Sequence, residues 1–152
     1  MPTYVCSVPK QLLSAQQKTL MAQKITQAHH EATGAPAYFV QVMIEERENS
    51  SLFLGGEPQG DHLWIRGDIR AGRSAGQRAA LMQSILREVA RIAGIDESRI
   101  WIYLCNLEAG DMVEYGHVLP LPGQEQQWFD ELPAALQQRL MALGVDKGGF
   151  TL

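Results

Sequence analysis

The sequence predicts an α/β protein in which two tandem β-α-β units form a four-stranded sheet with both helices on one face. Three observations lead to this prediction. The chain repeats itself with a shift of 60 positions and no gap, each repeat passes from a strand-like run to a helix-capping motif, and each closes on a second β-rich run. The units cover approximately residues 2–45 and 62–105 of a single domain, and residues 106–152 form a C-terminal extension.

Identical residues at equivalent positions define the repeat. Other aligned pairs are conservative, such as Val40 with Ile100 and Val42 with Ile102. The identical pairs are Ser14 and Ser74, Ala15 and Ala75, Gln17 and Gln77, Gln23 and Gln83, Ile25 and Ile85, and Gly34 and Gly94.

Each unit contains two strand-like runs rich in β-branched and aromatic residues. The first runs are Thr3–Val8 and Leu63–Ile69, and the second are Tyr38–Ile44 and Arg99–Cys105. Because a helix connects the two strands of a unit, we expect them to be parallel with a right-handed crossover.

Each connecting helix has a start signal and a stop signal. The capping boxes Ser14–Gln17 and Ser74–Gln77 predict the starts, and apolar residues at helical spacing follow. Gly34 and Gly94 predict left-handed caps at the ends.

The remaining segments are shorter. Phe53–Gly56, in the polar stretch between the units, is predicted to form a short hairpin. After the second unit we expect a loop around Met112–Gly123 and a short helix near Pro133–Leu143.

The face of the sheet opposite the helices is also predicted to be buried. Ile100–Cys105 is apolar on both sides, and Tyr103 faces the same side as Trp101 and Cys105. Association into a closed oligomer would cover this face.

Composition and charge exclude several classes of protein. The net charge of −4 argues against a nucleic acid or an anionic membrane as partner. No apolar run reaches the roughly 20 residues that span a bilayer, and the start of the chain lacks the pattern of a signal peptide.

Cys6 and Cys105 lie in apolar runs without CxxC spacing, so we expect reduced, buried cysteines in a cytoplasmic protein.

Pro2 is the residue with the most distinctive potential chemistry. Methionine aminopeptidase removes an initiator Met that precedes a small residue, so the mature chain is expected to begin at Pro2. Its free secondary amine could act as an acid or a base. If Met1 were retained, the nitrogen would be a tertiary amide and could do neither.

Arg70 and Arg73 are the candidate anion ligands. They follow the third strand and precede the helix capped by Ser74, where exposed N–H groups and the helix dipole also favour an anion. Two guanidinium groups there suit a carboxylate or a phosphate. The other interpretation is that they are two solvated surface arginines or partners for nearby acidic residues.

Three further residues are candidates. His29 lies inside the first helix, either facing a cleft as a hydrogen-bond donor or exposed to solvent. Glu114 is a carboxylate between apolar residues, whose surroundings could raise its pKa and make it a general base. Tyr103, if buried, needs a partner for its hydroxyl. The adjacent His29 and His30 point in different directions and no HExxH spacing occurs, so we expect no metal site and no cofactor.

Together these residues resemble the tautomerase superfamily, and within it the cis-3-chloroacrylic acid dehalogenase group. The resemblance covers nearly the whole chain. It rests on six residues of the family's functional types and on several motifs. The residues are Pro2, His29, Arg70, Arg73, Tyr103 and Glu114, and the motifs include Ile25–His29, Phe53–Gly56, Arg70–Ser74, Ile100–Tyr103, Met112–Gly116, Leu119–Gly123 and Trp128–Phe129. It implies the tautomerase fold and a homotrimer.

The resemblance also implies a mechanism. Arg70 and Arg73 would hold the carboxylate of a small unsaturated substrate, assisted by His29. Glu114, helped by Tyr103, would activate a water that attacks C3, and Pro2 would deliver a proton to C2. With cis-3-chloroacrylate the product would be malonate semialdehyde.

Other functions remain open at this point. The substrate could be an acetylenic acid that is hydrated and then decarboxylated. Pro2 could instead be neutral and serve as the base of a keto–enol tautomerase. A non-catalytic, trimeric anion-binding protein is the alternative from a different class.

Overall fold

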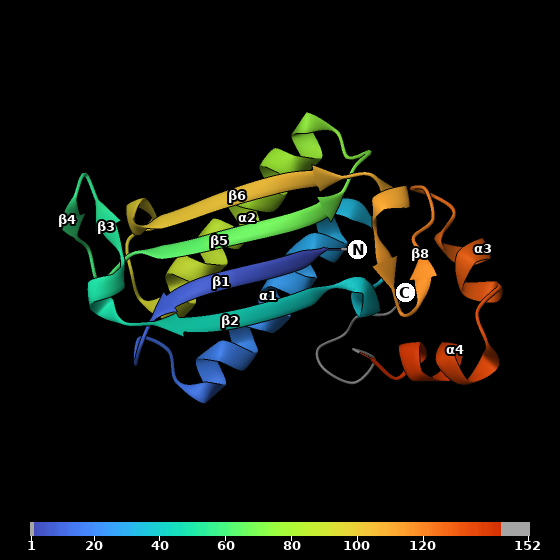
Figure 1. The fold of residues 1–152 in the computed structure, drawn as a ribbon, viewed down its shortest axis with the longest axis horizontal. Coiled ribbons are helices and arrows are strands. Elements are labelled where there is room, and N and C mark those ends of the chain that lie inside the picture. The colour runs from blue at the N-terminus through green and yellow to red at the C-terminus, as the bar shows by residue number, and fades with distance from the viewer. Residues whose placement is uncertain (1, 144–152) are drawn as a thin grey trace.

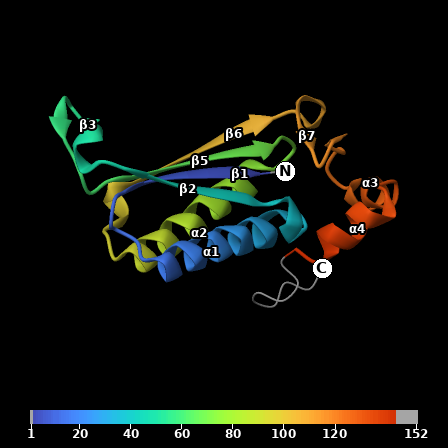
Figure 2. The same ribbon diagram turned by 60° about the horizontal axis from the view of Figure 1, so that its bottom comes forward.

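A mixed four-stranded sheet, with two helices packed against one face, forms the body of the protein in the computed structural model, which describes residues 2–143 (Figures 1 and 2). The strands are β1 (Thr3–Pro9), β2 (Gln41–Arg47), β5 (Leu63–Arg70) and β6 (Ile100–Leu107). Their order in the sheet is β2-β1-β5-β6. The predicted α/β architecture is therefore confirmed.

The register of the sheet decides which chain ends meet. The strands within each unit are parallel, β1 with β2 and β5 with β6. Between the units, β1 and β5 are antiparallel, and Thr3 pairs with Asp68. The start of β1 consequently lies beside the end of β5, so that the segment beginning at Pro2 adjoins the segment ending at Arg70.

The two helices are α1 (Ala15–Thr33) and α2 (Ala75–Ala93), and both predicted capping boxes form. Gly34 and Gly94 cap the ends in the left-handed conformation. The side chain of Gln17 donates to the carbonyl of Ile92, and that of Gln77 donates to the carbonyl of Ala32. Each helix start thus contacts the end of the other helix, which fixes their antiparallel arrangement.

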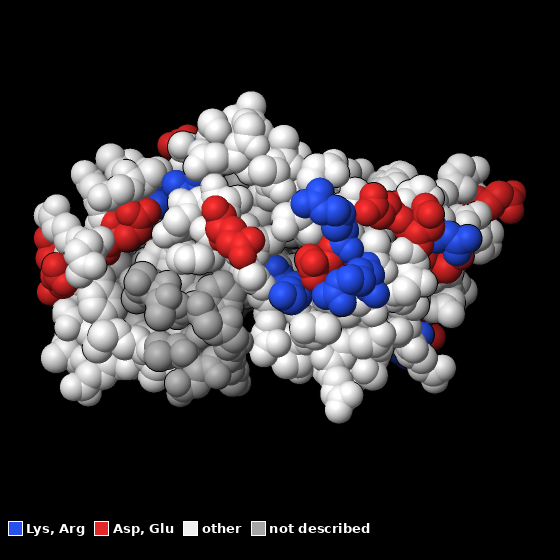
Figure 3. All heavy atoms as spheres, turned by 180° about the vertical axis from the view of Figure 1, so that it is seen from behind, with Lys and Arg blue, Asp and Glu red and all other residues white. Residues whose placement is uncertain are grey.

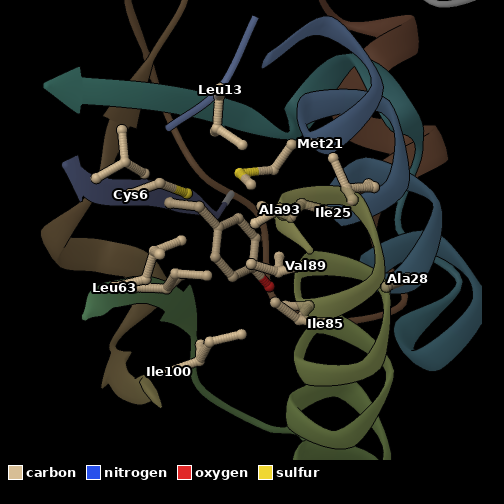
Figure 4. Packing of buried hydrophobic residues seen from close by; sticks show 14 of the residues in the cluster. Cys6, Leu13, Met21, Ile25, Ala28, Leu63, Ile85, Val89, Ala93 and Ile100 are labelled. Carbon is tan, nitrogen blue, oxygen red and sulfur yellow. The ribbon is translucent and has the colours of Figure 1, made fainter. Parts of the chain in front are cut away.

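The main core lies between the helices and the sheet (Figure 4). Tyr4 and Cys6 of β1 point into it, and both are fully buried. Opposite them, Met21 and Ile25 of α1 and Ile85 of α2 are fully buried as well. Burial of one such large aliphatic side chain contributes about 1.5–3 kcal/mol.

The repeat extends beyond the predicted units into the short elements. A hairpin of β3 (Phe53–Leu54) and β4 (Glu57–Pro58) follows β2 as predicted, and a hairpin of β7 (Val113–Glu114) and β8 (His117–Val118) follows β6 at the same shift of 60. The predicted loop at 112–123 therefore contains a hairpin. Short 3-10 helices precede the hairpins at Asn49–Ser51 and Ala109–Asp111, and precede β2 and β6 at Ala37–Phe39 and Glu97–Arg99.

One strand prediction was wrong at its start. Tyr38 and Phe39 lie in the 3-10 helix Ala37–Phe39, and β2 begins only at Gln41. Their rings pack on a second core, away from the sheet, with Phe39 against Trp128. Burial in this second core places both rings in the turn, although their residue types favour a strand.

The C-terminal extension builds that second core. The unpredicted helix α3 (Glu125–Asp130) and the predicted helix α4 (Ala134–Met141) lie at one end of the sheet (Figure 1). They bury Trp128, Leu132 and Leu140 against Leu119 and Phe39. No helix within residues 2–143 is long and apolar enough to cross a membrane.

The two faces of the molecule differ in character. On the helix side, Lys and Arg lie among Asp and Glu (Figure 3). The opposite face of the sheet is bare, and Met43, Trp101 and Tyr103 are 43, 46 and 50% exposed. A single chain therefore leaves open the apolar face that the sequence predicts to be buried. Cys105 is only partly buried, and both cysteines are free.

Candidate active site

The end of the sheet where β1 begins and β5 ends collects most of the predicted functional residues. Pro2 is buried, and its carbonyl accepts a hydrogen bond of 3.0 Å from the amide of Gln41. Arg70 is the last residue of β5, and Arg73 follows in the loop before α2. The antiparallel pairing of β1 with β5 is what brings the two segments together.

Arg70 is a buried, oriented cation. It is 2% exposed, its Nη1 donates to the carbonyl of Pro120 at 2.5 Å, and its Nη2 forms an ion pair with Glu125. Its Nε is buried and has no hydrogen-bond partner within residues 2–143. A buried donor without a partner is costly unless a ligand satisfies it. The interpretation of Arg70 as a solvated surface residue is therefore excluded, whereas Arg70 does act as the partner of a nearby acid, Glu125.

Arg73 is the more accessible cation. Its side chain is partly buried, and burial first, then the neighbouring charge of Arg70, lowers its pKa from the usual value. The loop between them turns at Gly72, where φ is +104° and a Cβ would lie 2.8 Å from Pro122. A side chain there would be strained and would collide with the segment that holds Arg70.

His29 lies inside the protein rather than on the exposed side of α1. It is 2% exposed, and its Nδ1 lies 2.8 Å from the hydroxyl of Tyr4. Burial, followed by the positive charges of Arg73 and Arg70, lowers its pKa to about 3. The imidazole is consequently neutral at physiological pH and belongs to the same electrostatic cluster as the two arginines.

The low pKa of His29 predicts a loss of stability on acidification. The unfolded chain takes up this proton near pH 6.5, whereas the folded chain does so only near pH 3. The free energy of unfolding should therefore fall as the pH drops through this window, by up to about 1.4 kcal/mol per pH unit. The free energy of unfolding, measured with urea between pH 5 and 7, should change less steeply with pH for His29→Gln than for the wild type. Equal dependence on pH in the two proteins would contradict the assignment.

Glu114 lines a pocket of about 490 Å³ next to the start of β1. Its hairpin faces Thr3, Tyr38 and Gln41 across this space. Tyr38 also lines this pocket, and burial, followed by the negative charge of Glu125, raises the pKa of Tyr38 to about 12. Glu114 is partly buried, so the pocket presents a carboxylate beside the segment that begins at Pro2.

Tyr103 is not brought to this pocket within one chain. It lies on the bare face of β6, pairs with Arg66, and is half exposed. It lines a second pocket, of about 370 Å³, with Arg47, His62 and Trp101.

The second pocket is the counterpart of the first under the shift of 60. Leu63, Phe53 and Leu54 line it, at the positions that correspond to Thr3, Val113 and Glu114. His62 stands at the position equivalent to Pro2. The pocket that contains Tyr103 therefore repeats the backbone of the first with different side chains.

Two residues of the site were missed from the sequence. Tyr4 lies within an apolar strand pattern that indicates core packing only, and Glu125 pairs with Arg70 across 55 positions. A hydroxyl on an otherwise apolar buried strand is the signal that could have indicated Tyr4. Within residues 2–143, no group of three or more His, Cys, Asp or Glu side chains could hold a metal ion.

Comparisons with known proteins agree with the fold. The family model Tautomerase_3, whose description is "Putative oxalocrotonate tautomerase enzyme", matches residues 1–131. The crystal structure of N1, a member of the cis-3-chloroacrylic acid dehalogenase family, is 34% identical with a TM-score of 0.89, over 93% of this chain and 99% of that one. The chain thus belongs to the tautomerase superfamily, in the cis-3-chloroacrylic acid dehalogenase-like group.

Two further solved structures extend the comparison. Native Ps01740 is 33% identical with a TM-score of 0.71, over 74% of this chain and 99% of that one. A fused 4-OT symmetric trimer is 20% identical with a TM-score of 0.72, over 77% of this chain and 94% of that one, and shows the fold alone. A search of curated proteins found no match.

Proposed function

We propose that this tautomerase-superfamily protein is a cofactor-independent hydratase, which adds water to an activated unsaturated carboxylate and releases halide from cis-3-chloroacrylate. The observation that carries the proposal is the buried Arg70, whose side chain is held at the end of β5 with an unsatisfied Nε–H. A small carboxylate can satisfy such a donor, and the adjacent Arg73 can bind the same anion.

The proposed steps distribute the chemistry among separate residues. The two arginines withdraw electron density through the carboxylate, and neutral His29 adds a hydrogen bond. Glu114 takes a proton from a water molecule as the water oxygen bonds to C3, while Pro2 gives a proton to C2. The 3-chloro-3-hydroxypropanoate that results loses HCl to form malonate semialdehyde.

This scheme requires a protonated Pro2 amine, and Glu125 supports that state. Nearby cations lower the pKa of an α-amine, whose ordinary value is about 7.7–8.0. The ion pair with Glu125 offsets the charge of Arg70, and Glu114 adds a second negative charge near the start of β1. Titration of the Pro2 nitrogen by NMR tests this, and a neutral amine at pH 7 would favour a keto–enol tautomerase instead.

A homotrimer completes the proposed site. Within one chain, Tyr103 is in register with Arg66 of β5 and, across β5, with Val5 in the middle of β1, and it lines a different pocket from Glu114. The apolar face that carries Tyr103 is open to a second copy. We infer that a neighbouring subunit brings its Tyr103 to the pocket of Glu114.

The first test is an NMR time course with cis-3-chloroacrylate, using protein whose intact mass confirms removal of Met1. Fast formation of malonate semialdehyde, lost in Glu114→Gln, is the expected result. Absence of turnover would overturn the dehalogenase assignment, and the same assay with an acetylenic acid would then identify a hydratase of different substrate range.

A further inference from the structure

Tyr4 and His29 form a hydrogen-bonded polar pair in the protein interior. Tyr4 is fully buried and His29 is 2% exposed, and the phenol oxygen lies 2.8 Å from Nδ1. Their rings meet edge to face, with centroids 5.9 Å apart and planes at 71°. Both side chains are therefore fixed in position and orientation.

The neighbouring strand keeps the Tyr4 ring in place. Tyr4 pairs with Gly67 of β5, and a Cβ on Gly67 would lie 2.6 Å from Cε1 of the ring. The absence of a side chain at this position gives the ring its space. The Tyr4 hydroxyl is thereby directed toward α1 and His29.

The hydrogen-bond partners of the Tyr4 hydroxyl determine the tautomer of His29. If Nδ1 carried the proton, it would donate to the Tyr4 oxygen. The phenol hydrogen would then lack an acceptor, because no other partner of this hydroxyl occurs within residues 2–143. If Nδ1 is the acceptor, the hydroxyl is satisfied and the ring proton resides on Nε2, on the far side of the imidazole from Tyr4.

We infer that Tyr4 is a positioning residue that acts through His29: its hydroxyl donates to Nδ1 and holds the imidazole as the Nε2–H tautomer, a fixed donor for the anion bound by Arg70 and Arg73. The assignment of the tautomer rests on geometry alone, whereas the role of the imidazole toward a bound anion rests on the proposed function. Burial raises the pKa of Tyr4, which keeps the phenol protonated and able to donate.

The tautomer is tested by long-range ¹H–¹⁵N NMR of the histidine ring nitrogens, which requires no substrate. In the wild type, His29 should show an unprotonated Nδ1 and a protonated Nε2 from pH 5 to 8. In Tyr4→Phe, the Nδ1 signal should shift because it loses its donor. A protonated Nδ1 in the wild type, or unchanged His29 signals in Tyr4→Phe, would overturn the inference.

The functional coupling is tested by a double-mutant cycle on kcat/KM. Tyr4→Phe should lower kcat/KM by about five- to tenfold, as expected for loss of one hydrogen bond. In the His29→Gln background the same change should have almost no further effect, because Tyr4 acts only through the imidazole. Equal losses in both backgrounds would refute the coupling, and thermal melts of all four proteins show whether each is folded.

The two tests separate the possible failures. If no unsaturated acid is turned over, the proposed function fails, while the NMR result still decides the tautomer. If turnover occurs but His29 has its proton on Nδ1, the role of Tyr4 fails and the proposed function stands.

Discussion

Blocking the Pro2 nitrogen is expected to lower kcat by about 10²–10⁴-fold, the range typical of a positioned acid or base. A chain that keeps an uncleaved residue before Pro2 has a tertiary amide in place of the amine and cannot transfer a proton. Pro2→Ala keeps a titratable primary amine after Met1 is removed, so it should retain more activity than the blocked chain.

Substrate binding should survive the block, because the cations of the site lie on β5 and in its following loop. The dissociation constant of a small carboxylate should change by less than about threefold, well below 1 kcal/mol. Single-turnover rates and equilibrium titrations, made on protein of confirmed intact mass, separate the two effects. Full turnover by the blocked chain would remove Pro2 from the mechanism.

Arg70→Ala and Arg73→Ala should differ sharply in their effect on stability. Removing Arg70 breaks a buried ion pair and leaves Glu125 without its cation. Breaking such pairs costs about 3–5 kcal/mol, and we expect the lower end because Glu125 keeps 20% of its side chain in contact with solvent. Removing the more accessible Arg73 should cost less than about 1 kcal/mol.

Both arginine variants should nevertheless lose kcat/KM. Each removes charge-assisted hydrogen bonds to a carboxylate, which are worth about 1.5–3 kcal/mol, or roughly 10–150-fold. Glu125→Gln is the matched control for stability, because it removes the same ion pair while the guanidinium remains. Urea unfolding and steady-state kinetics are the measurements, and equal stability of the two arginine variants would contradict the structural role of Arg70.

Most of the fold was predictable because the repeat supplies each element twice. The capping boxes and glycine caps depend on residues close in sequence, so helix bounds could be inferred at both positions. The same shift could have predicted the second hairpin, since Tyr115 and Gly116 occupy the positions of Gly55 and Gly56, and all four have positive φ. The strand prediction for Tyr38 and Phe39 was wrong because both rings pack in the second core against residues distant in sequence. This packing overrides their local preference for a strand.

The sequence indicates candidate site residues, but it does not specify the contacts that these residues make in the fold. Pro2, His29, Arg70 and Arg73 are indicated by residue type and resemblance, and the pairing of β1 with β5 explains why the segment of Pro2 adjoins the end of the strand that carries Arg70. The contacts of Tyr4 and Glu125 depend on packing between distant segments, which periodicity does not specify. Tyr103 lines a different pocket from Glu114 within one chain, and no local sequence pattern specifies this separation.

The paired pockets at opposite ends of the sheet have a consequence for how such a protein can change. Separate, identical subunits must carry the same residues in every pocket, so any substitution alters all of them together. A repeat within one chain is free of this constraint. Here Glu114 faces one pocket while Leu54 occupies the equivalent place in the other. One half can therefore keep a carboxylate while its counterpart evolves toward an apolar contact surface, with no change in the backbone they share.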